Sequence, residues 1–185
     1  MRVLRLELAN FRNYAALRFE PPEGACVLVG ANAQGKSNVL EALGVLSLGK
    51  SFRAVRESDL IRFDAPLASV SARVRTRAGE ATAECVIARS GEGARKRFSR
   101  NGRRISYGDF LGGITAVTFV PADLGLVTGP AGVRRRLLNA ALSQIDRGYY
   151  HDLAAYVKLL AQKNAFLKSA DAADRALLAT YNAQV

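Results

Sequence analysis

Residues 30–37 read Gly30-Ala31-Asn32-Ala33-Gln34-Gly35-Lys36-Ser37, which matches the pattern G-x-x-x-x-G-K-[ST] at every fixed position. Glycines let such a loop wrap so that successive backbone N–H groups meet phosphate oxygens, and the helix that follows adds its positive N-terminal end. The lysine of the pattern lies against the β- and γ-phosphates, and the serine hydroxyl is offered to Mg²⁺. The stretch therefore predicts a phosphate-binding loop for a nucleoside triphosphate.

The sequence on either side of this loop has the order that the loop needs, a strand before it and a helix after it. Residues 25–29, Ala-Cys-Val-Leu-Val, include no polar residue, which is typical of a strand buried on both faces of a sheet. After Lys36 apolar residues recur at helical spacing until Gly49 supplies a stop. This context argues against the alternative, an incidental glycine-rich turn.

The rest of the chain divides into a β-rich part and a helical part. Alternating polar and apolar residues predict strands over 4–8, 16–20, 70–75, 81–88, 96–99, 103–106 and 114–120. Asn101-Gly102 is the preferred two-residue hairpin turn. Beyond Pro130 the period becomes helical, with helices expected over 137–145, 153–167 and 172–183. We expect a nucleotide-binding lobe over 1–130 and the start of a helical lobe over 131–185.

Charge predicts a polyanionic partner. The formal net charge is +11, and 21 of the 27 basic residues are arginines, whose guanidinium forks suit phosphate geometry. Nucleic acid is favoured over a membrane because no basic amphipathic helix with a bulky apolar face stands out. A GC-rich genome, whose codons favour Arg and Ala, is the alternative explanation.

Two further features bear on the location of the protein. The first eight residues lack the apolar run of a signal peptide, and no segment reaches the roughly 18 apolar residues of a membrane span. Cys26 and Cys85 both lie in apolar, strand-like runs without metal-ligand spacing, which predicts two reduced core thiols. We therefore expect a cytoplasmic protein.

The hairpin around Asn101-Gly102 is strongly basic. It could contact a DNA backbone, or its charges could simply keep an exposed sheet edge from pairing. The candidate DNA-binding residues are Arg95, Lys96, Arg97, Arg100, Arg103 and Arg104. Arg134–Arg136 are interpreted as a solvated first helical turn, and His151, the only histidine, as an ordinary helical residue.

Several blocks of sequence carry a family resemblance. Asn10-Phe11-Arg12-Asn13-Tyr14, followed by GANAQGKSNVLEAL over 30–43, resembles the start of the SMC/Rad50/RecF group of ATPase heads. Blocks at 51–53, 119–130, 134–139 and 149–168 are similar to the RecF family in particular, and they follow one another in family order.

The resemblance implies an α/β fold of the P-loop NTPase class. Its form would be an ABC-type ATPase head, a mixed-sheet lobe that carries the loop, followed by the start of a helical lobe. The implied activity is ATP-dependent DNA binding in recombinational repair and replication-fork maintenance, on single-stranded, gapped or duplex DNA. The implied partners are RecO-like and RecR-like proteins that help to load RecA, and a second copy of the protein in an ATP-dependent homodimer.

The resemblance also assigns roles to individual residues. Arg12 and Asn13 would contact the nucleotide phosphates or base, Asn32 and Lys36 the γ-phosphate, and Ser37 the Mg²⁺ ion. Asp123 falls in the segment that corresponds to the Q-loop and would be a second metal contact. The family usually has Glu at the position of Ala122 and an acidic residue at that of Asn139, so the Q-loop assignment is the weakest.

The sequence lacks two motifs that an ABC head needs for hydrolysis. No apolar run ending in two acidic residues, the Walker B pattern, follows the loop, and no serine-rich signature motif is present. We expect a chain without its C-terminal half, and the catalytic residues stay unknown. The alternatives are a weakly DNA-stimulated ATPase in the intact protein, a nucleotide-gated DNA-binding module without hydrolysis, and a transport-type ABC ATPase. A transport-type head would carry a glutamine in its Q-loop, and residues 119–136 contain none.

Overall fold

A single antiparallel sheet is formed by strands within residues 2–105. The computed structural model describes residues 1–169 and 180–183. Its sheet has six strands in the order β2-β1-β3-β4-β5-β6, and every neighbouring pair is antiparallel. The strands are β1 (Arg2–Phe11), β2 (Tyr14–Phe19), β3 (Leu67–Thr76), β4 (Gly79–Ser90), β5 (Gly93–Arg100) and β6 (Arg103–Ile105).

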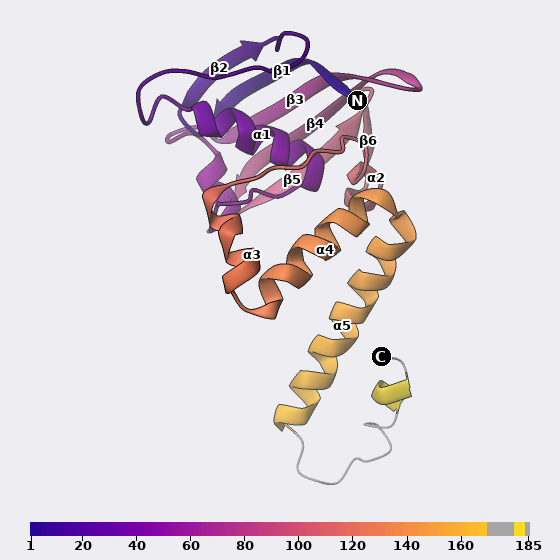
Figure 1. Cartoon of the computed structure of the whole chain (residues 1–185). Helices are drawn as coiled ribbons and strands as arrows, with labels where there is room; N and C mark the ends of the chain where they lie inside the picture. Colours follow the sequence, from indigo (N-terminus) through magenta and orange to yellow (C-terminus); the bar gives the residue numbers. More distant parts are fainter. Residues whose placement is uncertain (170–179, 184–185) are drawn as a thin grey trace.

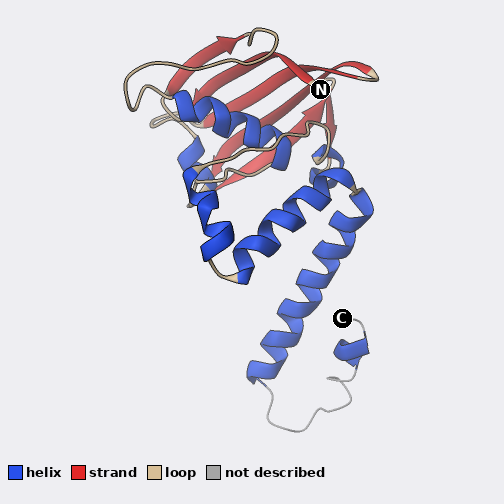
Figure 2. Cartoon of the chain, viewed as in Figure 1, coloured by secondary structure: helices blue, strands red, loops and turns tan. Residues whose placement is uncertain are grey.

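Helix α1 (Lys36–Leu48) lies across one face of this sheet (Figures 1 and 2). It ends where predicted, because Gly49 adopts a left-handed conformation (φ 64°) and its N–H bonds to the carbonyl oxygen of Val45. Alternate residues of β1, β3, β4 and β5 point toward the helix and form the core with its apolar side. The core includes Leu6, Leu8, Val39, Ala42, Val45, Leu46, Val70, Ala72, Cys85, Ile87 and Phe98. The opposite face of the sheet is polar, as expected for a sheet covered on one side.

The remaining elements are helical. Short turns of helix, η1 (Glu57–Leu60), α2 (Tyr107–Phe110), η2 (Pro121–Leu124) and α3 (Gly125–Thr128), precede the two long helices α4 (Ala131–Ile145) and α5 (Arg147–Ser169). The long helices pack against each other and lead away from the sheet (Figure 1). Of the helix predicted over 172–183, residues 172–179 lie outside the described residues, and 180–183 are helical. No helix in the described ranges is both long and apolar enough to span a membrane.

The predicted hairpin between β5 and β6 is confirmed. Asn101 and Gly102 both have positive φ, 50° and 74°, as a type I′ turn requires. Fold class is confirmed as well, α/β with a phosphate loop between the sheet and the helices. The sheet differs in one respect from the mixed one expected, because it contains no parallel pair within the described residues.

The reason is that two predicted strands have no partner strand in the described part of the chain. Residues 25–29 and 115–120 belong to no strand, and Ile114 is a buried residue in a bend. The prediction that the first segment is buried on both faces was therefore wrong. Val27 and Val29 are 81% and 89% exposed, and Val117 is 98% exposed. Cys26 lies in the first segment and is exposed too, so only Cys85 is the buried core thiol that was predicted. Apolar composition predicts that a strand is buried, but burial also requires a second element that packs on it. The described residues leave Val27, Val29 and Val117 without such cover.

Candidate nucleotide-binding site

The phosphate loop has the backbone shape that its glycines allow. Gly30, Ala33 and Gly35 have φ of 155°, 64° and 99°, so three of the six residues from 30 to 35 have positive φ. Left-handed backbone is strained for any residue with a β-carbon, so the conformation of Ala33 has an energetic cost. The loop runs from segment 25–29 into the first turn of α1, where Gly35 is the residue that caps the helix.

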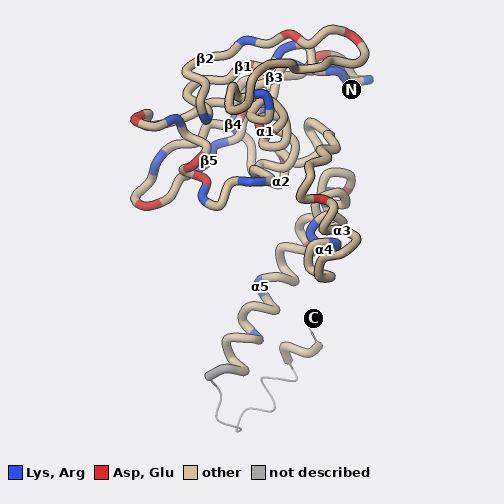
Figure 3. Tube along the Cα trace, turned by 60° about the vertical axis from the view of Figure 1, so that its left-hand side comes forward, with Lys and Arg blue, Asp and Glu red and all other residues tan. Residues whose placement is uncertain are grey.

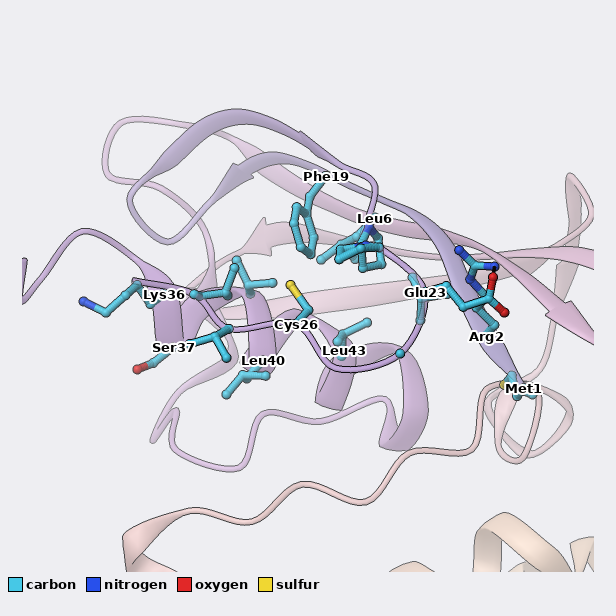
Figure 4. A pocket seen from close by; sticks show the side chains of 17 residues that line it. Met1, Arg2, Leu6, Phe19, Glu23, Cys26, Lys36, Ser37, Leu40 and Leu43 are labelled. Carbon is cyan, nitrogen blue, oxygen red and sulfur yellow. Dashed lines mark ion pairs between the residues drawn. The ribbon is translucent and has the colours of Figure 1, made fainter. Parts of the chain in front are cut away.

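Lys36 and Ser37 are placed as a ligand site needs them. Nζ of Lys36 donates to the carbonyl oxygens of Gly30 (2.7 Å) and Ala31 (2.6 Å), so the ammonium group lies inside the curve of the loop. In Figure 4 both side chains point away from the apolar cavity that Leu6 and Phe19 line. Both residues line that cavity, but their polar ends, the predicted phosphate and metal ligands, lie together on the side facing away from it.

A small cleft of about 250 Å³ forms on that side of the loop. It is lined by Asn32, Ala33, Gly35, Lys36, Ser37, Asn38 and Arg53. Five of these residues belong to the predicted loop. The cleft supplies two cations and a hydroxyl group, which suit a polyphosphate with a divalent ion.

A second, larger cleft of about 1050 Å³ adjoins the first, and Asn38 lines both. Arg12 and Asn13, which the resemblance assigned to the nucleotide, line this second cleft from the turn between β1 and β2. Asn13 also joins the turn to the loop: its Nδ2 lies 3.4 Å from the carbonyl oxygen of Ala33, and its Oδ1 accepts from Nδ2 of Asn38 at 2.6 Å. The structure thus brings the predicted residues from 10–14 and 30–37 to one place.

Sequence reasoning missed the residue that connects these groups, Glu41. Its side chain is fully buried, and its carboxylate accepts hydrogen bonds from Arg12, Arg53 and Ser51. Burial by itself raises the pKa of Glu41, but the bonds from Arg12, Arg53 and Ser51 outweigh it and hold this pKa below its usual value. An acid on the sheet-facing side of α1 was a signal of such pairing, because an unpaired charge is costly to bury.

Asp123 lies in a different environment. Its Oδ2 accepts a hydrogen bond from the backbone N–H of Val120 at 2.8 Å, which caps η2, and Asp123 does not line the cleft of Ser37. The described residues also hold no group of three His, Cys, Asp or Glu side chains that could bind a metal. Among the predicted metal contacts, only Ser37 lies in the phosphate cleft.

The six basic residues around the β5–β6 hairpin separate into two groups. Arg95, Arg97, Arg103 and Arg104 are exposed. Lys96 points to the helix-covered side, where Nζ bonds to the carbonyl oxygen of Gly49 and pairs with Glu57 at 2.5 Å. Arg100 donates to the carbonyl oxygens of Asp109 and Phe110. Lys96 and Arg100 therefore have internal partners, which leaves four arginines open to a DNA backbone.

Fold and site together define the class of the protein. A phosphate loop that precedes a helix lying on an antiparallel sheet, with two long helices after it, is the arrangement of an ABC-type ATPase head of the P-loop class. Comparison with known proteins narrows this class to a family, although no family model matches the sequence.

The resemblance of the chain to the N-terminal portion of the RecF family is confirmed. It is 39% identical over 175 residues to the DNA replication and repair protein RecF of Geobacillus kaustophilus, covering 95% of this chain and 46% of the relative. It is 38% identical over 170 residues to RecF of Bacillus subtilis, with coverages of 91% and 45%. A structure described as the recombination mediator protein RecF-ATP in the RecFOR pathway aligns with a TM-score of 0.86 at 34% identity, over 97% of this chain and 48% of that one. The chain spans about half the length of the curated relatives it matches.

Proposed function

We propose that this chain binds ATP with Mg²⁺ and is the nucleotide-binding part of an ATP-dependent DNA-binding protein of DNA replication and repair. The observation that carries the proposal is the cleft in which Lys36, Ser37 and Arg53 meet beside the phosphate loop. Polyphosphate would occupy this cleft, with Lys36 leaving the carbonyl oxygens of Gly30 and Ala31 for phosphate oxygens. The nucleoside would enter the adjoining cleft lined by Arg12 and Asn13.

The proposed process is recombinational repair of gapped or single-stranded DNA and the maintenance of replication forks. The protein would act as an ATP-dependent homodimer, with RecO-like and RecR-like partners that promote RecA loading. Support comes from the family and from the relatives' names, which refer to DNA replication and repair and to the RecFOR pathway. We also propose a boundary near residue 130, with a nucleotide-binding lobe before it and the start of a helical lobe after it.

DNA contact is proposed at the exposed hairpin arginines. Figure 3 shows basic positions along the strands and loops of the sheet. Arg95 and Arg97 alternate with Lys96 along β5, so both lie on the polar face of the sheet. Arginines on an open sheet face suit contacts to phosphates that position DNA without reading its sequence.

A second candidate function, nucleotide-gated binding without hydrolysis, is favoured for this chain by the composition of the cleft. None of the described residues that line the phosphate cleft is acidic. Phosphoryl transfer to water requires a group that orients the water in line, in addition to groups that neutralise phosphate charge. A turnover assay with Mg²⁺, ATP and DNA distinguishes the two: Lys36-dependent phosphate release from this chain would favour the ATPase.

The experiment that tests ATP binding is calorimetry with Mg²⁺ and ATP on the wild type and on Lys36→Ala. We expect the variant to lose at least about tenfold in affinity, ~1.4 kcal/mol, because no neighbour can supply the lost charge. Lys50→Ala is the matched control, since Lys50 is exposed beyond the end of α1 and lines neither cleft. Equal affinity in wild type and Lys36→Ala would refute the site.

A further inference from the structure

Glu41 accepts hydrogen bonds on both carboxylate oxygens. Oε1 accepts from Nη2 of Arg12 (2.6 Å) and Oγ of Ser51 (2.6 Å). Oε2 accepts from Nε of Arg12 (3.0 Å) and from Nε and Nη2 of Arg53 (2.9 and 2.7 Å). The guanidinium groups of Arg12 and Arg53 thus both bind the carboxylate of Glu41, whose side chain is fully buried. Arg12 donates one N–H group to each carboxylate oxygen, and Arg53 donates two N–H groups to Oε2, so both guanidinium planes are held in orientation by two bonds.

The two arginines come from different segments and enter different clefts. Arg12 belongs to the β1–β2 turn and lines the larger cleft, while Arg53 follows α1 and lines the phosphate cleft. Asn38, which lines both clefts, accepts from Nη2 of Arg53 through Oδ1. Glu41 lies one helical turn beyond Ser37, so it ties both arginines to the helix that begins at the loop.

Other bonds complete the arrangement. Nη1 of Arg12 donates to the carbonyl oxygen of Asp59 at 2.8 Å, and Oγ of Ser51 accepts from the backbone N–H groups of Arg53 and Ala54 at 3.0 and 2.8 Å. In the described part of the chain Nη1 of Arg53 has no hydrogen-bond partner. One carboxylate against two guanidiniums leaves one positive charge in excess beside Lys36. The cluster therefore holds its arginines in place and still attracts an anion.

We propose that Glu41 is a positioning residue, which holds Arg12 and Arg53 at the two adjoining clefts so that one nucleoside triphosphate is bound across both. This proposal rests on the proposed ATP-binding function and adds the group that orients the site. Glu41 itself touches no ligand, because its side chain is buried behind the arginines. Its effect on binding is expected to pass entirely through the two guanidinium groups.

The test is calorimetry on the full 185-residue chain and its variants, with Mg²⁺-ATP and with inorganic tripolyphosphate as ligands. Glu41→Gln preserves shape but removes the charge that aligns the arginines, and we expect both affinities to fall about tenfold. Arg53→Ala should weaken both ligands, while Arg12→Ala should weaken ATP and leave tripolyphosphate nearly unchanged. Glu57→Gln is the matched control, since Glu57 pairs with Lys96 and lines neither cleft; its affinities should equal those of the wild type.

A double-mutant comparison separates positioning from a merely structural role. In an Arg12→Ala/Arg53→Ala background, Glu41→Gln should cause no further loss of ligand affinity, because no guanidinium is left to orient. A further loss in that background, or wild-type affinity in folded Glu41→Gln, would overturn the proposal. If Glu41→Gln fails to fold, Ser51→Ala replaces it, with a smaller loss expected for both ligands and unchanged affinity counting against us. If Lys36→Ala leaves ATP affinity unchanged, the proposed nucleotide-binding function is refuted. If ATP affinity depends on Lys36 but is unchanged in Glu41→Gln, only the positioning role of Glu41 is refuted.

Discussion

Gly35 lies so close to Asn13 that a β-carbon on Gly35 would be 2.7 Å from Oδ1 of Asn13 and 2.9 Å from its Nδ2. The same β-carbon would lie 2.9 Å from the ring of Tyr14. Gly35 also has φ of 99°, which L side chains rarely adopt. The second glycine of the phosphate loop is thus required twice, by the backbone conformation and by the β1–β2 turn that packs on it.

This contact predicts the effect of Gly35→Ala. The methyl group must push Asn13 and Tyr14 away or distort the loop, and left-handed backbone adds a cost of ~1–2 kcal/mol. We expect lower stability in urea unfolding and weaker ATP binding in calorimetry. Gly132→Ala is the control, because nothing lies within 4 Å of its position in α4, and its stability should be unchanged or higher. Wild-type behaviour of Gly35→Ala would contradict the close packing.

The buried carboxylate of Glu41 predicts a pH dependence of stability. Its pKa is lower in the folded chain than the ordinary value of 4.5, so folding favours the charged form. The stabilisation that depends on this charge is complete above pH 4.5 and is lost as pH falls through the lower, folded-state pKa. Urea unfolding of wild type and Glu41→Gln over a pH series should show a difference in free energy that shrinks toward acid. The difference isolates Glu41, since Glu20 and Glu80, whose pKa values are also lowered, are present in both proteins. A difference that stays constant with pH would show that the charge of Glu41 does not matter.

DNA binding should depend on salt through the exposed hairpin arginines. Each phosphate contact that is lost lowers the slope of log K against log salt by ~0.9 on duplex DNA. We expect Arg97→Gln and Arg104→Gln each to reduce the slope by about that amount, with little change in sequence preference. Arg62→Gln, an exposed arginine outside the hairpin, is the control and should leave the slope unchanged. Fluorescence anisotropy from low to high salt measures the slopes; identical slopes in all four proteins would place the DNA elsewhere.

The exposed segments 25–29 and 115–120 predict self-association of this chain. Val27, Val29 and Val117 lie in segments that belong to no strand, and they offer exposed apolar surface to another chain. We expect sedimentation velocity to show oligomers that grow with concentration, and Val27→Asp together with Val117→Asp to shift the population toward monomer. Val55→Asp alters an equally exposed valine outside both segments and should have little effect. A wild-type chain that stays monomeric at all concentrations would contradict this expectation.

Local patterns in the sequence determined a large part of the molecule. The phosphate loop, helix α1 with its stop at Gly49 and the Asn101-Gly102 hairpin occur where predicted, and the helices predicted over 137–145 and 153–167 lie within the longer α4 and α5. These features depend on interactions between residues a few positions apart: left-handed glycines, helical or alternating periodicity, and turn chemistry. Such interactions are encoded in short stretches, and short stretches are sufficient to predict them.

Only the tertiary structure decided what each segment contacts. It left residues 25–29 and 115–120 outside any strand, turned Lys96 and Arg100 toward internal acceptors, and used Asp123 as a helix cap. It also joined Arg12 to Arg53 through Glu41, although the two arginines are 41 positions apart in the sequence. Apolar composition predicts that a strand is covered by another element, and the charge of an arginine predicts that it has an acidic or polar partner. Which group provides the cover or the partner depends on segments that are distant in sequence, and their positions are set by packing of the whole sheet and helix together.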